Sequence, residues 1–101
     1  MPSTATVSEK SLQAAVTQLL DLLGIDWYHT YDARRSNKGW PDLAICGRRF
    51  MLRELKTDRG ELTDDQVRWG KRLQAAGVDW AIWRPCDLWS GRIQDELMAI
   101  R

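Results

Sequence analysis

The apolar residues in the first quarter of the chain recur every three or four positions. Such spacing places them on one face of a helix, which can then be buried against a core. The residues concerned are Leu12, Ala15, Val16, Leu19, Leu20 and Leu23. Thr6 or Ser8 is available as the N-cap, and Gly24 is placed to end the helix. The pattern predicts a helix over residues 7–23.

The pattern then changes to short apolar runs separated by turn residues. Residues 25–31 are rich in aromatic side chains and predict a strand, whereas residues 32–39 are polar and predict a loop. Two further runs follow at residues 42–46 and 49–56, with only the dipeptide Gly-Arg between them. A break this short predicts a β-hairpin.

The second half of the chain predicts a helix, a strand and another helix. Thr63 is placed to cap the first of these helices and Gly77 to stop it. Residues 78–83 predict the strand, which Pro85 ends, and residues 93–100 predict a short helical tail. This order predicts one α/β domain comprising all 101 residues, with a central mixed sheet flanked by helices.

The charges are distributed unevenly along the chain. The formal net charge of only +1 does not by itself indicate a nucleic-acid-binding protein. Residues 33–59, however, contain eight basic residues and three acidic ones. This local excess favours an anionic partner for that part of the chain.

Cysteine usage and hydropathy predict the compartment. Cys46 and Cys86 lack the spacing of metal ligands, and the N-terminal residues do not resemble the apolar core of a signal peptide. We therefore expect a reduced, cytosolic protein. No apolar run approaches the roughly 20 residues of a membrane span, so we expect no membrane partner.

Three ionisable residues of the predicted hairpin can share one surface. Glu54 and Lys56 lie two positions apart in its second strand, so their side chains point to the same face. Asp42 begins the first strand, and antiparallel pairing can bring the start of one strand close to the end of its neighbour. We therefore expect Asp42 and Glu54 to converge beside Lys56.

This grouping suits a hard divalent cation. Two carboxylates and one outward backbone carbonyl, here that of Leu55, form an oxygen-only partial shell that fits Mg²⁺ or Mn²⁺. Lys56 could then orient a water or stabilise the negative charge that develops during phosphodiester hydrolysis. For an isolated Glu-x-Lys triplet, a charge pair on a solvated strand is the ordinary explanation.

The order of the motifs separates this chain from an isolated triplet. The segment GWPDL at residues 39–43 is followed by the hairpin, by ELK at residues 54–56, and by a helix that opens with TDDQ at residues 63–66. In this order, from about Glu9 to Trp83, the chain resembles the VRR-NUC family of the PD-(D/E)xK nuclease superfamily, and its small stand-alone members in particular.

The resemblance implies a PD-(D/E)xK restriction-endonuclease-like core with the element order αβββαβ. It also implies that Asp42 and Glu54 are metal ligands, that Lys56 is the catalytic lysine, and that Gln66 is the motif glutamine of the following helix. Glu9 resembles the N-terminal acidic residue of the family, which lies at or near the metal site and can contribute a ligand.

Two of these residues have an alternative explanation. Gln66 lies three residues after Thr63, and Glu9 lies three residues after Thr6, so both fit a capping box without any catalytic role. Helical spacing nevertheless places both on faces that should meet the rest of the domain. Gln66 shares such a face with Gly70. We keep both explanations open.

Four residues before or beside the hairpin are candidates for nucleic-acid binding. Arg34, Arg35 and Lys38 could contact a phosphate backbone, or they could belong to an ordinary solvated loop. Trp40 could stack on a base, or it could cover the core.

These features predict a metal-dependent, structure-selective DNA endonuclease. Stand-alone members of the family resemble phage-type nucleases, so we expect Holliday junctions or other branched DNA as substrate, in a bacterial or phage-infected cytosol. A two-fold homodimer would allow two strands to be cut symmetrically. The alternatives are a nuclease of flap, forked or nicked DNA, a non-catalytic nucleic-acid-binding module of the same fold, and a protein-interaction domain without metal dependence.

Overall fold

The chain folds around one mixed sheet. The structure is a computed structural model that describes residues 7–30 and 37–101. Its elements, in chain order, are α1 (Glu9–Leu23), β1 (Asp26–His29), β2 (Leu43–Cys46), β3 (Phe50–Leu55), α2 (Asp64–Ala75), β4 (Asp79–Trp83), α3 (Pro85–Trp89) and α4 (Arg92–Ile100). The elements predicted from the hydrophobic pattern are all present.

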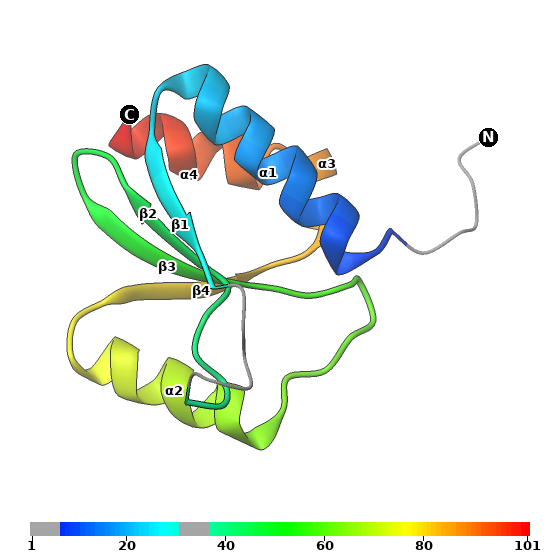
Figure 1. Ribbon diagram of the computed structural model, residues 1–101, viewed down its shortest axis with the longest axis vertical. Coiled ribbons are helices and arrows are strands. Elements are labelled where there is room, and N and C mark those ends of the chain that lie inside the picture. The colour runs from blue at the N-terminus through cyan, green and yellow to red at the C-terminus, as the bar shows by residue number, and fades with distance from the viewer. Residues whose placement is uncertain (1–6, 31–36) are drawn as a thin grey trace.

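The four strands are ordered β1-β2-β3-β4. β1, β2 and β3 pair antiparallel, and β4 joins β3 in parallel after the crossover through α2. α1, α3 and α4 lie on one face of the sheet and α2 lies on the other (Figure 1). The predicted class, an α/β domain with a mixed sheet and helices on both faces, is confirmed.

The two faces of the sheet differ in what they carry. In β3, alternate residues face α1 and α4, where Met51 and Leu55 join a core that also contains Leu43, Ile45 and Trp83. The residues between them point to the face that α2 partly covers. Because Glu54 belongs to this second set, its carboxylate lies on the opposite side of the sheet from the main apolar core.

Helix ends follow the expected capping chemistry. The Ser8 side chain accepts a hydrogen bond from Ser11 N, so Ser8 is the N-cap of α1. Gly24 ends α1 with a φ of 70°, and Gly77 follows α2 with a φ of 84°, a conformation that glycine adopts without strain. Of the two N-caps that the sequence allowed for α1, Ser8 is the one used, and the predicted N-cap Thr63 and the stops Gly24 and Gly77 are confirmed.

The C-terminal region differs from the sequence prediction. Pro85, expected only to end a strand, is the first residue of α3. Proline suits that position because its fixed φ is already helical and its missing N–H would have no helical partner.

None of the described helices is both long and apolar enough to cross a membrane.

Candidate active site

Asp42 and Glu54 come together where the hairpin leaves the sheet. Leu43 pairs with Arg53, so Asp42 and Glu54 occupy the next position on each strand. The Asp42 Oδ2 atom accepts a hydrogen bond of 2.7 Å from Leu55 N. The N–H and C=O of one strand residue point toward the same neighbouring strand, so the Leu55 carbonyl is also directed to the Asp42 side.

The segment before Asp42 is held against the start of α2. Gly39 has a φ of 87°, and a Cβ on it would lie only 2.4 Å from the carbonyl carbon of Asp65. Only glycine permits this approach of two backbones. Pro41, two residues later, is buried. The GWPD segment therefore fixes Asp42 beside the helix that carries Gln66.

Gln66 forms the capping box of α2 and also contacts Glu54. Its Oε1 accepts a hydrogen bond of 2.9 Å from Thr63 N, while Gln66 N donates to Thr63 Oγ1, which completes a capping box. Its Nε2 donates a hydrogen bond of 3.1 Å to Glu54 Oε1. The Gln66 amide thus joins the first turn of α2 to the Glu54 carboxyl group of β3.

Glu54 is a buried carboxyl group with an incomplete set of partners. Its residue exposure is 1%. Its Oε2 atom is buried and has no hydrogen-bond partner among the residues that the structure describes. Burial raises the pKa of Glu54 to about 10. The Asp42 carboxylate raises it further, because it repels a negative charge and can accept a hydrogen bond only from the protonated form of Glu54. Without a cation, the carboxyl is therefore protonated at neutral pH.

The donors gathered here fit a divalent cation. The carboxylate of Asp42, the Oε2 atom of Glu54 and the carbonyl of Leu55 are oxygen donors, as Mg²⁺ and Mn²⁺ prefer. Within residues 7–30 and 37–101 there is no group of three or more His, Cys, Asp or Glu residues that could hold an ion. A cation bound here would have two carboxylates, and other oxygen ligands would complete its coordination.

Lys56 follows Glu54 at the end of β3. Its backbone N donates to Trp83 O, a bond that belongs to the parallel pairing of Leu55 with Trp83. The Lys56 charge acts on Glu54 by lowering its pKa, opposite to the effect of burial. The ammonium therefore lies near enough to the carboxyl to influence its ionisation.

The loop after Lys56 is fastened to the rest of the domain. Arg84 Nη1 donates hydrogen bonds to Thr57 O at 2.7 Å and to Gly60 O at 2.6 Å. Asp58 accepts a hydrogen bond from Cys86 N. These contacts hold the segment between β3 and α2 in place, although sequence motifs gave no sign of them.

Glu9 is the first residue of α1 and is exposed. Because Ser8 is the N-cap, the capping box proposed between Thr6 and Glu9 is wrong. Glu9 does not continue the buried stripe of Leu12 and Val16 into the core. Its charge nevertheless raises the pKa of Glu54, so Glu9 lies at the margin of the same site.

The candidate nucleic-acid-binding residues are only partly described. Arg34 and Arg35 lie outside the described residues. Lys38 is exposed, and its carbonyl accepts a hydrogen bond from Trp69 Nε1. Trp40 packs edge-on against Trp69, with ring centroids 4.9 Å apart, and remains 38% exposed. Trp40 is therefore not among the buried core residues.

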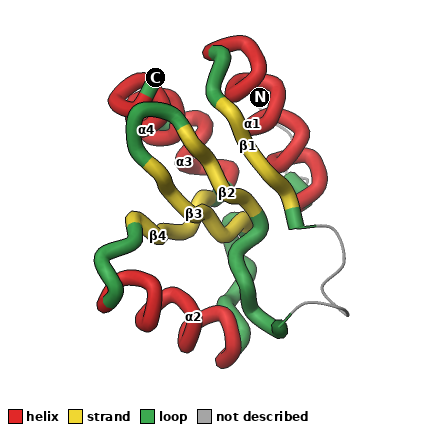
Figure 2. The backbone as a smooth tube through the Cα atoms, turned by 60° about the vertical axis from the view of Figure 1, so that its left-hand side comes forward, coloured by secondary structure: helices red, strands yellow, loops and turns green. Residues whose placement is uncertain are grey.

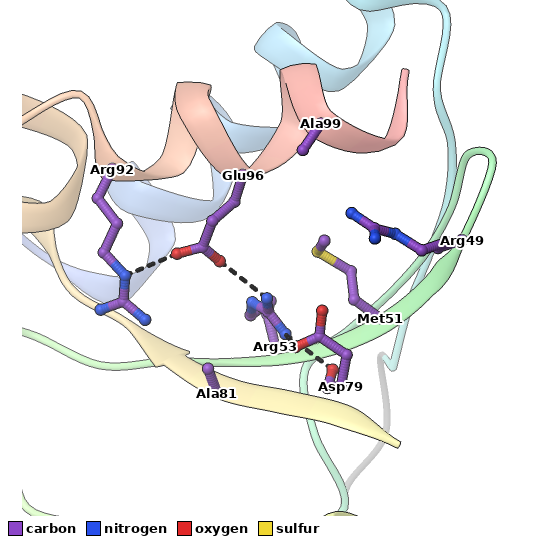
Figure 3. Close-up of a pocket in the computed structure, with 8 residues that line it drawn as sticks. All are labelled: Arg49, Met51, Arg53, Asp79, Ala81, Arg92, Glu96 and Ala99. Atoms are coloured by element: carbon purple, nitrogen blue, oxygen red, sulfur yellow. Dashed lines mark hydrogen bonds and ion pairs between the residues drawn. The ribbon is translucent and has the colours of Figure 1, made fainter. Parts of the chain in front are cut away.

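Arg53, one of the eight basic residues between positions 33 and 59, is not available to an anionic partner. The side chain is buried and donates hydrogen bonds of 2.8 Å to Glu96 Oε1 and to the Asp79 carbonyl (Figure 3). Its guanidinium lies over the Trp83 ring. The adjoining cavity, of about 300 Å³, is lined by both cations and carboxylates, among them Arg92. Arg53 is therefore a structural residue on the face opposite Glu54. The sequence could have indicated this, because Arg53 alternates with Met51 and Leu55 along the strand and so points to the same face as they do.

Comparisons of the chain with models of known protein families, with curated proteins and with solved structures found no match. The site is therefore interpreted from its own geometry together with the motif order of the sequence.

Proposed function

We propose that the protein is a metal-dependent nuclease that hydrolyses phosphodiester bonds at the Asp42–Glu54 site. One observation carries the proposal: a buried carboxyl group has an oxygen without a partner and lies beside a second carboxylate. A carboxyl in this position carries a large desolvation cost, which a structural role alone does not explain. Perturbed ionisable groups of this kind concentrate at functional sites.

Asp42, Glu54 and the Leu55 carbonyl are the groups that would hold Mg²⁺ or Mn²⁺. When bound, the cation would supply Lewis acidity, lower the pKa of a water and offset the negative charge of a phosphate. The chain itself keeps the site partly dry, because Glu54 is buried between β3 and α2. Exclusion of water strengthens the electrostatic interactions in the site.

The neighbouring side chains have distinct proposed roles. Lys56 provides a positive charge that can orient the attacking water or stabilise the pentacoordinate transition state. Gln66 orients Glu54 through its 3.1 Å hydrogen bond, which leaves the other carboxylate oxygen free for a ligand. Glu9 lies at the margin of the site, and its proposed role is an electrostatic effect on Glu54, because it does not form a group of three possible ligands with Asp42 and Glu54.

The proposed substrate is branched DNA. The motif order from residue 9 to residue 83 resembles the VRR-NUC family, whose stand-alone members suggest cleavage of Holliday junctions. Lys38 and Trp40, both exposed to solvent, lie next to Asp42 in the chain and could contact the DNA strand. A homodimer would present two such sites to one junction.

A substrate panel tests this proposal. The native chain is incubated with labelled linear, forked, flapped and four-way DNA of equal length, in the presence of Mg²⁺, Mn²⁺ or EDTA. We expect cleavage with either cation, none with EDTA, and the highest rate on the four-way junction. DNA binding without cleavage under every condition would contradict the nuclease proposal and favour a non-catalytic binding module.

A further inference from the structure

A patch of apolar side chains is exposed on the same sheet face as Glu54. α2 packs over β4, and β1 and β2 extend away from it (Figure 2). The face toward the hairpin tip therefore leaves Tyr28 66% exposed and Phe50 49% exposed. With Ala44 and Cys46 they line an open hollow of about 260 Å³. We call these four residues the aromatic slot.

Strand register defines the shape of the slot. Tyr28 in β1 is paired with Ala44 in β2, and Phe50 in β3 is paired with Cys46 in β2. Paired residues point to the same face of the sheet, so the two small side chains form the floor and the two aromatic rings stand at its sides. Such a slot accommodates a flat apolar group.

Charge favours a base over a phosphate in this slot. Asp26, which is exposed and pairs with Cys46, also lines the hollow. A carboxylate repels a phosphate but accepts hydrogen bonds from the amino groups of bases. The aromatic rings add stacking, which every base can provide.

The aromatic slot adjoins the proposed active site. Ala44 lies two residues from Asp42 along β2 and points to the same face. Two residues of strand span about 7 Å, whereas stacked nucleotides of one DNA strand are about 3.4 Å apart. A phosphate at Asp42 and Glu54 therefore leaves the slot within reach of a base only a few nucleotides away.

We propose that the aromatic slot binds an unpaired nucleobase of the DNA strand whose phosphate occupies the Asp42–Glu54 site. A base inside a duplex is covered on both faces by its neighbours and cannot enter, so the slot selects substrates with unpaired nucleotides near the cut. This inference rests on the proposed nuclease function and specifies the substrate further.

A second copy of the chain fits the slot less well. A stable protein interface buries about 800 Å² on each partner. Trp27 also lines the hollow but pairs with the core residue Ile45 and so points to the opposite face. The slot residues on this face include two large apolar side chains, Tyr28 and Phe50, and two small ones, Ala44 and Cys46. The size of the slot therefore matches one or two bases.

Substitution of Tyr28 tests the slot. Binding of fluorescein-labelled single-stranded, forked and duplex DNA is measured by anisotropy in Ca²⁺ for the native chain, Tyr28→Ala and Tyr28→Phe. The matched control is Trp89→Ala, which removes an aromatic side chain that is 71% exposed on α3. We expect Tyr28→Ala to bind single-stranded and forked DNA roughly 5- to 150-fold more weakly, the loss of one stacked base. Tyr28→Phe and Trp89→Ala should bind as the native chain does.

The other outcomes separate the two proposals. Equal binding by Tyr28→Ala and the native chain, with DNA cleavage retained, overturns the slot and leaves the nuclease function standing. If the native chain neither binds nor cuts DNA, both proposals fall. Sedimentation of the native chain and Tyr28→Ala provides the remaining comparison. If the native chain is a dimer and Tyr28→Ala is a monomer, this face is a protein interface and the proposed base-binding slot is overturned.

Discussion

Glu54 is distinguished from an ordinary strand carboxylate by its environment. Its side chain is almost fully buried, yet only one of its two oxygens receives a hydrogen bond from a described residue. Strand alternation predicted that it would share a face with Lys56, and hairpin pairing predicted its approach to Asp42. Its burial could not be predicted, because it depends on contacts between segments distant in the sequence, among them the hydrogen bond from Gln66 of α2.

The ionisation of Glu54 makes the free energy of unfolding decrease as pH rises. Its pKa in the folded protein is about 10, against the usual 4.5. Between these values the unfolded chain has lost the proton that the native state keeps, so the native state loses stability as pH rises. The slope can reach about 1.4 kcal/mol per pH unit. We expect thermal unfolding in EDTA to shift to lower temperature from pH 5 to pH 9.

Glu54→Gln provides the matched comparison, because an amide has nearly the same shape and does not titrate in this range. The variant should fold and should show a clearly smaller pH slope than the native chain. Equal slopes for the two proteins would mean that Glu54 is ionised in the metal-free fold. Mg²⁺ should reduce the native slope, because a cation stabilises the carboxylate form.

At the level of elements, α2 links stability to the proposed chemistry. Its first turn contains the capping box, and the same Gln66 amide contacts Glu54. Farther along the helix, Gly70 lies so close to the Trp80 ring that a Cβ would be only 2.6 Å from it. This close approach sets the distance between α2 and β4, and with it the position of Gln66.

Two substitutions separate capping from the proposed site role. Thr63→Ala removes the side-chain cap but leaves the Gln66 amide, and should cost about 0.5–2 kcal/mol of stability without altering DNA cleavage by the folded protein. Gln66→Ala removes both contacts, and should also lower the cleavage rate roughly 10- to 100-fold. Urea unfolding and single-turnover cleavage measure the two effects. Similar cleavage by the two variants would reduce Gln66 to a capping residue.

The elements themselves were largely predictable. Helical spacing identified α1, and the caps Ser8 and Thr63 with the stops Gly24 and Gly77 marked the helix ends. α3 was missed because a five-residue helix shows no periodicity, and Pro85 occurs both at the end of strands and at the start of helices.

In the whole molecule, the sheet separates two groups of charges. On the face covered by α4, Arg53 forms ion pairs with Glu96 and Asp79 and is stabilised by packing on the Trp83 ring. On the other face, the Glu54 carboxyl has no such counter-ion pair among the described residues. The fold thus pairs the buried Arg53 guanidinium with two carboxylates, although its Nε has no hydrogen-bond partner among the described residues, and provides no such ion pair for Glu54. From the sequence, Arg53 and Glu54 could be recognised as adjacent charged residues of one strand, but their different partners could not be predicted.

We propose that Glu54 and Lys56 carry out metal-dependent cleavage, and single-turnover cleavage by matched variants tests this proposal most directly. The native chain is compared with Glu54→Gln and Lys56→Met, and with Glu61→Gln as a control for the same change at an exposed acidic residue. We predict that Glu54→Gln and Lys56→Met each lower the rate in Mg²⁺ by more than about 1,000-fold, while Glu61→Gln cuts like the native chain. Cleavage by Glu54→Gln at the native rate would contradict the account.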